Sequence, residues 1–343
     1  MSRFLAAFPP GIEDIVRKEF EEKIGLNIIV ENNPLRVPGK LIVDMPVFGN
    51  KAPTPFRSID SLAEYVGSFR VERSRAALEK IYREIMRMSF PNGFLKASSF
   101  RVTCRRRGEH EYSSIEVEKV AGQALVDKHR LKVDLETFEV KVFIEIIDDA
   151  CFISLSGGEY SHGRYMVFNH PAALKPSIAY AMVRLAEVKP GMKVLDPMCG
   201  GGTIPIETAL TVSRVKIYGF DASDYFLEGA ALNAEAMRVG EKIVFKKVDC
   251  RKLSKAIGFK VDRIITDPPY GTRPVARIKP YPLYSRCLLE MKKVLEDGGK
   301  IVLITLKPDY VKKISSEIGL DLEHERRVKH GDAYPHIMVL TSS

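Results

Sequence analysis

In the second half of the chain, apolar residues occur in two patterns, as short continuous runs and at every third or fourth position. Short apolar runs predict strands over residues 193–196, 216–221, 242–248, 264–266 and 299–305. Apolar positions at every third or fourth residue predict helices over 177–187, 203–211, 224–239, 281–295 and 309–318, and a hairpin follows them. Strands that alternate with helices are typical of a doubly wound parallel sheet, so we expect an α/β domain here.

The first half has a different order of elements. Its predicted strands are 4–7, 27–30, 40–45, 99–104, 140–147 and 151–155, and its predicted helices are 10–20, 78–88 and 114–127. The β-α-β-β order at the start is typical of a small ferredoxin-like unit. Ser114 is the expected cap of the third helix, because a serine side chain at that position accepts a hydrogen bond from the first turn.

Several domains are expected, because 343 residues exceed the usual size of one core. The expected limits are a ferredoxin-like unit at 1–65, a second α+β domain at 66–165, a linker with prolines at 166–178 and the α/β domain at 179–343.

Charge and composition narrow the class of protein. A net charge of +9 and a pI of about 9.1 fit a polyanionic partner. The composition is that of a globular protein, and no apolar run is long enough to cross a bilayer. The N-terminal apolar segment is too short for a signal peptide, so we expect a cytoplasmic protein. Five widely spaced cysteines without a Cys-x-x-Cys argue against a zinc site or a disulfide framework.

The first strand of the α/β half ends in an acid and a glycine-rich turn. Residues 196–203 read Asp-Pro-Met-Cys-Gly-Gly-Gly-Thr, directly before a predicted helix. Glycines allow the backbone to approach a ligand closely and to turn tightly into the helix. The pattern is neither the dinucleotide Gly-x-Gly-x-x-Gly nor a phosphate-binding loop with Gly-Lys-Ser/Thr. A purely structural turn remains the alternative.

Acids also close the next two strands. Asp221 follows the glycines by about twenty residues, a spacing that suits hydrogen bonds from ribose hydroxyls. Asp249 ends the third strand, where its carboxylate can accept from an adenine amino group while the Cys250 amide donates. Each acid alone could cap the element that follows it. Capping explains poorly why successive strands all end in this way.

The fourth strand ends in Asp267-Pro268-Pro269-Tyr270. The prolines stop the strand, because neither can donate to a sheet ladder. A carboxylate, a backbone carbonyl and an aromatic ring are thus held on a stiff turn at the carboxyl end of a strand, where ligands of open α/β sheets bind. The alternative is a rigid β-turn with a packed tyrosine, which the position after a parallel strand makes less favourable.

These motifs together resemble the Rossmann-fold methyltransferases that use S-adenosylmethionine, and among them the THUMP-containing tRNA guanine-N2-methyltransferases. The segments that carry the resemblance are 163–165, 170–175, 196–203, Ile206-Glu207, Asp221 and 267–271. Gly201 stands where the family commonly has serine, and Pro205 where it has an apolar residue. Within this family the chain is similar to the archaeal and bacterial subgroup that methylates guanine 6 of the acceptor stem.

Residues 66–165 are similar to a THUMP domain, a module of enzymes that bind tRNA. This likeness rests on the order of elements, the strand over 100–104 and the segments 152–158 and 162–165.

Basic residues that could neutralise RNA phosphates are Arg101, Arg105, Arg106, Arg107, Arg273, Arg277 and Lys279. A solvated surface is the open alternative for them.

The resemblance implies a seven-stranded, mostly parallel sheet, S-adenosylmethionine as cofactor, tRNA as partner, and a monomer without a metal or membrane. The implied catalytic residues are Asp267, Pro268 and Tyr270. The implied cofactor contacts are Asp196, Cys199, Gly200, Gly202, Thr203, Asp221, Ala222, Asp249, Cys250, Ala173 and Leu174. Methylation at guanine 10, adenine-N6 or cytosine-N4 methylation of another nucleic acid, and a non-catalytic RNA-binding protein remain alternatives.

Overall fold

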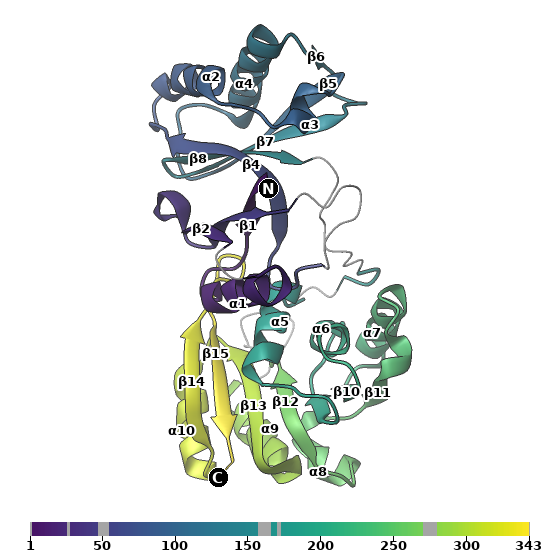
Figure 1. Cartoon of the computed structure of the whole chain (residues 1–343). Coiled ribbons are helices and arrows are strands. Elements are labelled where there is room, and N and C mark those ends of the chain that lie inside the picture. Colours follow the sequence, from purple (N-terminus) through teal and green to yellow (C-terminus); the bar gives the residue numbers. More distant parts are fainter. Residues whose placement is uncertain are drawn as a thin grey trace. The chain divides into compact units, whose positions relative to one another are not determined.

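The computed structural model describes residues 2–25, 28–46, 55–156, 166–169, 173–269 and 280–342 (Figure 1). The chain divides into two compact units. Unit 1 comprises residues 1–8 and 17–162, and unit 2 comprises residues 9–16 and 163–343. In the part of the chain that the structure describes, we find no helix with both the length and the apolar character of a membrane span.

Unit 1 is built on one eight-stranded sheet. In spatial order its strands are β2 (Ile29–Asn32), β3 (Lys40–Met45), β1 (Ser2–Ala7), β4 (Ser61–Arg70), β8 (Ala150–Ser156), β7 (Val140–Ile147), β5 (Ser99–Arg107) and β6 (Lys132–Val133). The sequence did not predict β4, whose residues are half-buried over most of its length and show no alternation of buried and exposed positions. The expected limit between residues 65 and 66 falls inside this strand.

Two helices cover one face of this sheet. The helical segments of unit 1 are α1 (Glu13–Lys23, whose residues 13–16 belong to unit 2), η1 (Pro34–Arg36), α2 (Ala76–Arg87), α3 (Asn92–Leu95) and α4 (Ser114–His129). Buried side chains of α2 and α4, among them Ile81 and Val117, pack against Phe100 of β5 and Ile144 of β7.

The cap of α4 is Ser113, so the expectation of Ser114 is wrong. The Ser113 hydroxyl accepts from the Glu116 N–H at 3.2 Å, and the Glu116 carboxylate accepts from the Ser113 N–H at 2.8 Å. This reciprocal pair satisfies two backbone donors that a helix start leaves without partners, and moving the cap one residue later would lose it.

Unit 2 is a doubly wound α/β domain. Its strands in spatial order are β11 (Ile243–Lys247), β10 (Lys216–Asp221), β9 (Lys193–Asp196), β12 (Val261–Thr266), β13 (Leu295–Thr305), β15 (His336–Thr341) and β14 (Asp321–Arg327). The first five run parallel, and β15 is antiparallel to both of its neighbours. The predicted seven-stranded, mostly parallel sheet is therefore confirmed.

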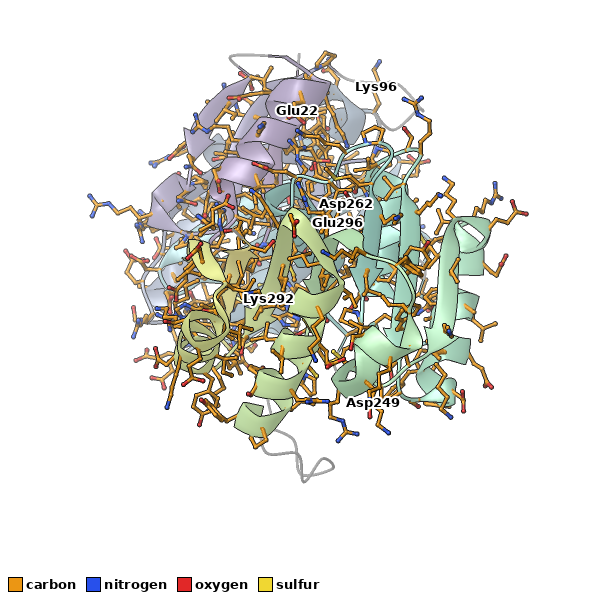
Figure 2. All side chains as sticks on the ribbon, turned by 90° about the horizontal axis from the view of Figure 1, so that it is seen from below. Glu22, Lys96, Asp249, Asp262, Lys292 and Glu296 are labelled. Atoms are coloured by element: carbon orange, nitrogen blue, oxygen red, sulfur yellow. The ribbon has the colours of Figure 1, made fainter. Side chains whose placement is uncertain are left out.

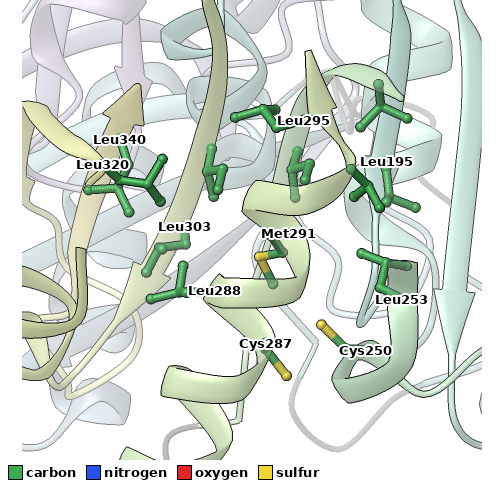
Figure 3. Packing of buried hydrophobic residues seen from close by; sticks show 14 of the residues in the cluster. Leu195, Cys250, Leu253, Cys287, Leu288, Met291, Leu295, Leu303, Leu320 and Leu340 are labelled. Carbon is green, nitrogen blue, oxygen red and sulfur yellow. The ribbon is translucent and has the colours of Figure 1, made fainter. Parts of the chain in front are cut away.

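Helices pack on both faces of this sheet. They are α5 (Pro176–Leu185), α6 (Thr203–Thr211), α7 (Asp224–Ala236), α8 (Leu253–Ala256), α9 (Pro280–Val294) and α10 (Pro308–Ile318), with the short turns η2 (Gly240–Lys242) and η3 (Cys250–Lys252). Met291 and Leu288 of α9 and Leu253 of α8 pack against Leu195 and Leu303 of the sheet (Figure 3). A separate cluster joins α6 and α7 to β10 and β11.

Side-chain hydrogen bonds also stabilise unit 2 at both ends of its strands. At the amino ends of the strands, the Asp262 carboxylate of β12 accepts from the Lys193 N–H of β9 at 2.8 Å (Figure 2 labels Asp262). Near the opposite ends, the Arg326 guanidinium of β14 donates to both oxygens of Asp14, at 2.6 and 3.0 Å. Asp14 lies in the N-terminal segment that belongs to this unit.

Candidate active site

The strand order reverses between β9 and β12. The chain leaves β9 for β10 and β11 on one side, then returns to β12 on the other side. Ligands of open α/β sheets bind in the crevice outside the carboxyl ends of the strands at such a reversal. Asp196 ends β9 and Asp267 directly follows β12, so two of the predicted site residues lie at this point.

The glycine turn after β9 is fixed by backbone hydrogen bonds. Cys199 N–H donates to the Phe220 carbonyl at 2.8 Å, and Gly202 N–H donates to the Cys199 carbonyl at 2.8 Å. Gly202 has φ +84°, and a Cβ there would lie 3.0 Å from the Cβ of Ala230 on α7. The missing side chain thus allows both the left-handed backbone and the close approach of α7. Thr203 then begins α6.

Asp221 connects the glycine turn with the start of α7. One of its carboxylate oxygens accepts from the Gly200 N–H and the other from the Ser223 N–H, both at 3.0 Å. The side chain is half-buried and the next residue, Ala222, is exposed. The carboxylate therefore holds the turn and keeps one side open toward solvent.

Asp196 is a buried acid in a negative environment. It is 3% exposed, and its carboxylate accepts from the Met198 N–H at 3.1 Å. Burial, together with the charges of Asp267 and Asp221, raises the pKa of Asp196 to about 8. The fully buried Thr266 hydroxyl lies beside this carboxylate and limits the rise in its pKa. Among the residues that the structure describes, the Thr266 hydroxyl makes no hydrogen bond of ordinary geometry. A cation that enters this site would stabilise the ionised carboxylate.

Asp249 is already engaged within the domain. Its carboxylate accepts from the Arg251 N–H at 2.9 Å and from the Arg251 guanidinium at 2.7 Å, and so caps η3. The hydrogen bond from Arg251 lowers the pKa of Asp249. The neighbouring Cys250 is buried, and its thiol interacts with that of Cys287 on α9 (Figure 3). The Cys287 thiol, and then burial, raise the pKa of Cys250.

The turn after β12 combines an accessible carboxylate with a buried ring. Asp267 is half-buried, Pro268 buried and Pro269 exposed. Next to them lies a cavity of about 10 Å³, lined in part by Met198, Thr266, Pro268 and Tyr284. It has room for about one water and cannot hold a base. Tyr270, Arg273, Arg277 and Lys279 lie outside the described residues.

The four arginines of β5 separate into two pairs. Arg101 donates to the Leu135 carbonyl at 3.0 Å. Arg106 donates to the Ser114 hydroxyl at 3.3 Å and lies 5.4 Å over the Tyr112 ring. Arg105 and Arg107 are exposed. Contacts within unit 1 thus hold Arg101 and Arg106, whereas Arg105 and Arg107 face solvent.

The sequence did not identify Asn233 of α7, which joins the linker to the glycine turn. Its amide donates to the carbonyls of Phe168 and Gly201, at 3.0 and 2.9 Å, and its oxygen accepts from the Phe168 N–H at 2.8 Å. Farther along the linker Ala173 is exposed and Leu174 buried. A useful signal was an amide in a helical stripe otherwise made of small residues, next to Ala230 and Ala234.

Comparisons with known proteins identify both domains. Residues 163–336, about half of the chain, match the model of the RMKL-like methyltransferase domain, and residues 75–156 match that of the THUMP domain. The chain belongs to the RMKL-like methyltransferase family. This member of the family is thus an S-adenosylmethionine-dependent enzyme, and the resemblance drawn from its motifs is confirmed.

Relatives of this methyltransferase match over most of its length. A protein of Archaeoglobus fulgidus named tRNA (guanine(6)-N2)-methyltransferase is 31% identical, over 98% of this chain and 91% of its own. A protein of the same name from Thermus thermophilus is 35% identical, over 71% of this chain and 72% of its own. The crystal structure of TrmN from Thermus thermophilus superposes with a TM-score of 0.80 at 29% identity and covers all of both chains.

Proposed function

We propose that this methyltransferase transfers the methyl group of S-adenosylmethionine to the exocyclic N2 amine of guanine 6 in tRNA. One observation carries the proposal: the glycine turn with Asp196 and the Asp267-Pro268 turn close adjacent strands at the reversal of strand order. The first turn suits a cofactor and the second an amine, so donor and acceptor meet at one edge of the sheet.

The residues around the glycine turn fit S-adenosylmethionine. The cofactor supplies an electrophilic methyl group on a sulfonium. Asp196 would bind the ammonium of its amino-acid end, because the buried carboxylate lacks a cation among the described residues around it. The free Cβ position at Gly202 allows close approach, and the half-exposed Asp221 would accept from the ribose hydroxyls. The remaining proposed contacts are Cys199, Gly200, Thr203, Ala222, Asp249, Cys250, Ala173 and Leu174.

Asp249 would act in adenine recognition by exchanging one of its contacts with Arg251 for the adenine amine. Its two oxygens accept four hydrogen bonds from Arg251, two to each oxygen, and the side chain is 28% exposed, so the amine can reach it. The buried Cys250 would contribute its backbone and the apolar wall on which the ring rests.

Asp267 and Pro268 would prepare the amine for attack. The lone pair of guanine N2 is delocalised into the ring, which makes this nitrogen a poor nucleophile. A carboxylate and a carbonyl that each accept one N–H draw the nitrogen toward tetrahedral geometry and direct its lone pair at the methyl group. After transfer, the proton leaves the nitrogen for Asp267 or for water. Tyr270 would stack on the flipped base. Positioning thus contributes most of the catalysis.

Unit 1 would hold the tRNA. In this proposal residues 1–65 and the THUMP domain at 66–165 bind the tRNA, the linker is 166–178, and transfer occurs in the domain at 179–343. Arg105 and Arg107 would be the phosphate contacts on β5, because their side chains are exposed. Arg273, Arg277 and Lys279 would contact phosphates near the target base. We expect the enzyme to act as a cytoplasmic monomer.

Site mapping tests the proposal. Purified enzyme and S-adenosylmethionine are incubated with a tRNA transcript that carries guanine at positions 6 and 10, and the product is digested and analysed by mass spectrometry. We expect N2-methylguanosine in the fragment that contains position 6. Two matched transcripts replace the base pair at position 6 or the one at position 10, and only the first replacement should abolish methylation.

Other outcomes identify the rival functions. Methyl incorporation at position 10 alone would assign the enzyme to that site, and a methylated adenine or cytosine would overturn the choice of base. Binding of tRNA without measurable binding of S-adenosylmethionine in calorimetry would support a non-catalytic protein.

A further inference from the structure

A single buried amide joins two parts of unit 2 that are distant in sequence. Asn233 is 1% exposed, and both of its N–H groups and its oxygen are used. Two of the three bonds go to the backbone of Phe168 in the linker and one goes to Gly201 in the glycine turn. Linker and turn are therefore held at a fixed separation by one side chain.

Packing reinforces this connection one helical turn earlier. The Phe168 ring lies against Gly229 so closely that a Cβ there would come within 2.3 to 2.6 Å of three of its ring carbons. The same ring has edge-to-face contacts with Tyr225 at 5.2 Å and with Phe226 at 6.5 Å. The glycine thus provides the space in which the linker residue lies, and α7 binds Phe168 through both its backbone and its ring.

From these contacts we infer that Asn233 is a positioning residue of the cofactor site, which couples the linker at Phe168 to the glycine turn. The inference rests on the proposed function, because it assigns the turn to S-adenosylmethionine. Without the amide, the Gly201 carbonyl and both backbone groups of Phe168 lose their partners. The turn and the linker can then move independently, and the cofactor must order them when it binds.

The first test compares Asn233→Ala with Asp262→Ala in the full-length enzyme. The control removes a hydrogen bond of similar length, which Asp262 accepts from the Lys193 N–H at the amino ends of the strands. We expect Asn233→Ala to raise the Kd of S-adenosylmethionine in calorimetry about tenfold, as for the loss of two or three hydrogen bonds. Turnover at saturating cofactor should change less than about threefold, and the Kd of the control should stay near that of the wild type.

Thermal melting separates this effect from general destabilisation. Both variants lose hydrogen bonds that are at least partly buried, so both should melt earlier. If Asn233→Ala leaves the Kd unchanged, or if both variants raise the Kd equally, Asn233 only supports the fold and the inference is wrong.

A second test does not depend on the folding of Asn233→Ala. Gly229→Ala places a methyl group against the Phe168 ring and should raise the cofactor Kd about threefold or more, because the linker must shift. In a Phe168→Ala background the space is free, so adding Gly229→Ala should have no further effect on the Kd. Equal effects of Gly229→Ala in both backgrounds, or none in the native one, would contradict coupling through the linker.

The two proposals can fail separately. An enzyme that binds S-adenosylmethionine but methylates no tRNA contradicts the proposed function, while the comparison of Kd values still decides the role of Asn233. Hydrogen exchange of the peptide with Phe168 gives an independent measure: it should accelerate in Asn233→Ala and stay slow in Asp262→Ala, and equal rates would again argue against coupling.

Discussion

The turns after β9 and β12 lie at the carboxyl ends of adjacent strands but are stabilised in different ways. After β9, Gly200 donates to Asp221 on β10 and Gly201 accepts from Asn233 on α7. After β12, two consecutive prolines restrict the backbone through their own rings. Partners in other elements thus hold the first turn, whereas the second is restricted by the rings of its own prolines. Substitutions should therefore affect the cofactor turn from a distance and the acceptor turn only locally.

The largest expected effect is that of Asp267→Ala. The carboxylate would contact the amine and not the cofactor, so turnover should fall at least about 100-fold, the range seen when one hydrogen-bonding group at a reacting centre is lost. The Kd of S-adenosylmethionine should stay within about twofold of the wild-type value. Calorimetry and methyl incorporation into tRNA measure the two quantities. Parallel losses of both would place Asp267 on the cofactor side and remove the proposed division between the turns.

Asp196→Asn should weaken cofactor binding more than turnover. The amide keeps the shape of the side chain but cannot pair as an anion with an ammonium group. We expect the Kd to rise about tenfold to 100-fold at pH 8.5, since hydrogen bonds to charged groups contribute about 1.5 to 3 kcal/mol. Turnover at saturating cofactor should fall much less than in Asp267→Ala. An unchanged Kd would show that the ammonium binds elsewhere.

The same acid predicts a pH dependence. The pKa of Asp196 is about 8 in the folded protein and about 3.9 in an unfolded chain. The cofactor-free protein thus binds more protons than the unfolded chain between these values. This contribution to stability is complete below about pH 4 and is lost as the pH rises toward 8. Because ammonium binding favours the anion, cofactor affinity should rise over the same window, with release of a proton at pH 6.5.

Calorimetry in buffers of different ionisation enthalpy measures that proton. Asp196→Asn cannot titrate at this position, so both the proton release and the rise of affinity with pH should be reduced in it. An equally steep pH profile in the variant would assign the titration to another group.

What the sequence predicted depends on whether the feature is local. The strand β9, the Gly200 to Gly202 turn and the helix α6 follow from periodicity and glycine chemistry within a few residues, and they lie where they were expected. The contacts of Asn233 join residues 65 and 32 positions apart, so no local pattern specifies them. The strand β4 was missed because partial burial on both faces removes the alternation on which strand prediction relies.

Gly202→Ala tests the turn after β9 directly. A side chain at Gly202 would be unfavourable for two reasons. The backbone is left-handed at φ +84°, and an added Cβ would lie only 3.0 Å from the Cβ of Ala230. We expect the free energy of unfolding to fall by about 1 to 2 kcal/mol, the usual cost of this conformation, and the cofactor Kd to rise several-fold. Gly298→Ala is the matched control. Gly298 also has a left-handed backbone, at φ +71°, but a Cβ added there would have no heavy atom within 4 Å apart from its chain neighbours. Gly298→Ala should lose a similar free energy of unfolding without a change in the cofactor Kd. A rise of the Kd in both variants would show that the turn after β9 has no special role in cofactor binding.

The smallest expected effect is that of Pro268→Ala. The substitution keeps the carbonyl that would accept from the amine and removes only the ring that restricts the backbone. Releasing such a constraint costs about 0.4 to 1 kcal/mol, so turnover should fall about twofold to fivefold while the cofactor Kd stays unchanged. Pro308→Ala, at the first turn of α10, makes the same change away from both turns and should leave turnover at the wild-type level. If turnover fell as far as in Asp267→Ala, the buried Pro268 ring would be acting through the residues packed around it. The acceptor turn would then depend on other elements, as the cofactor turn does.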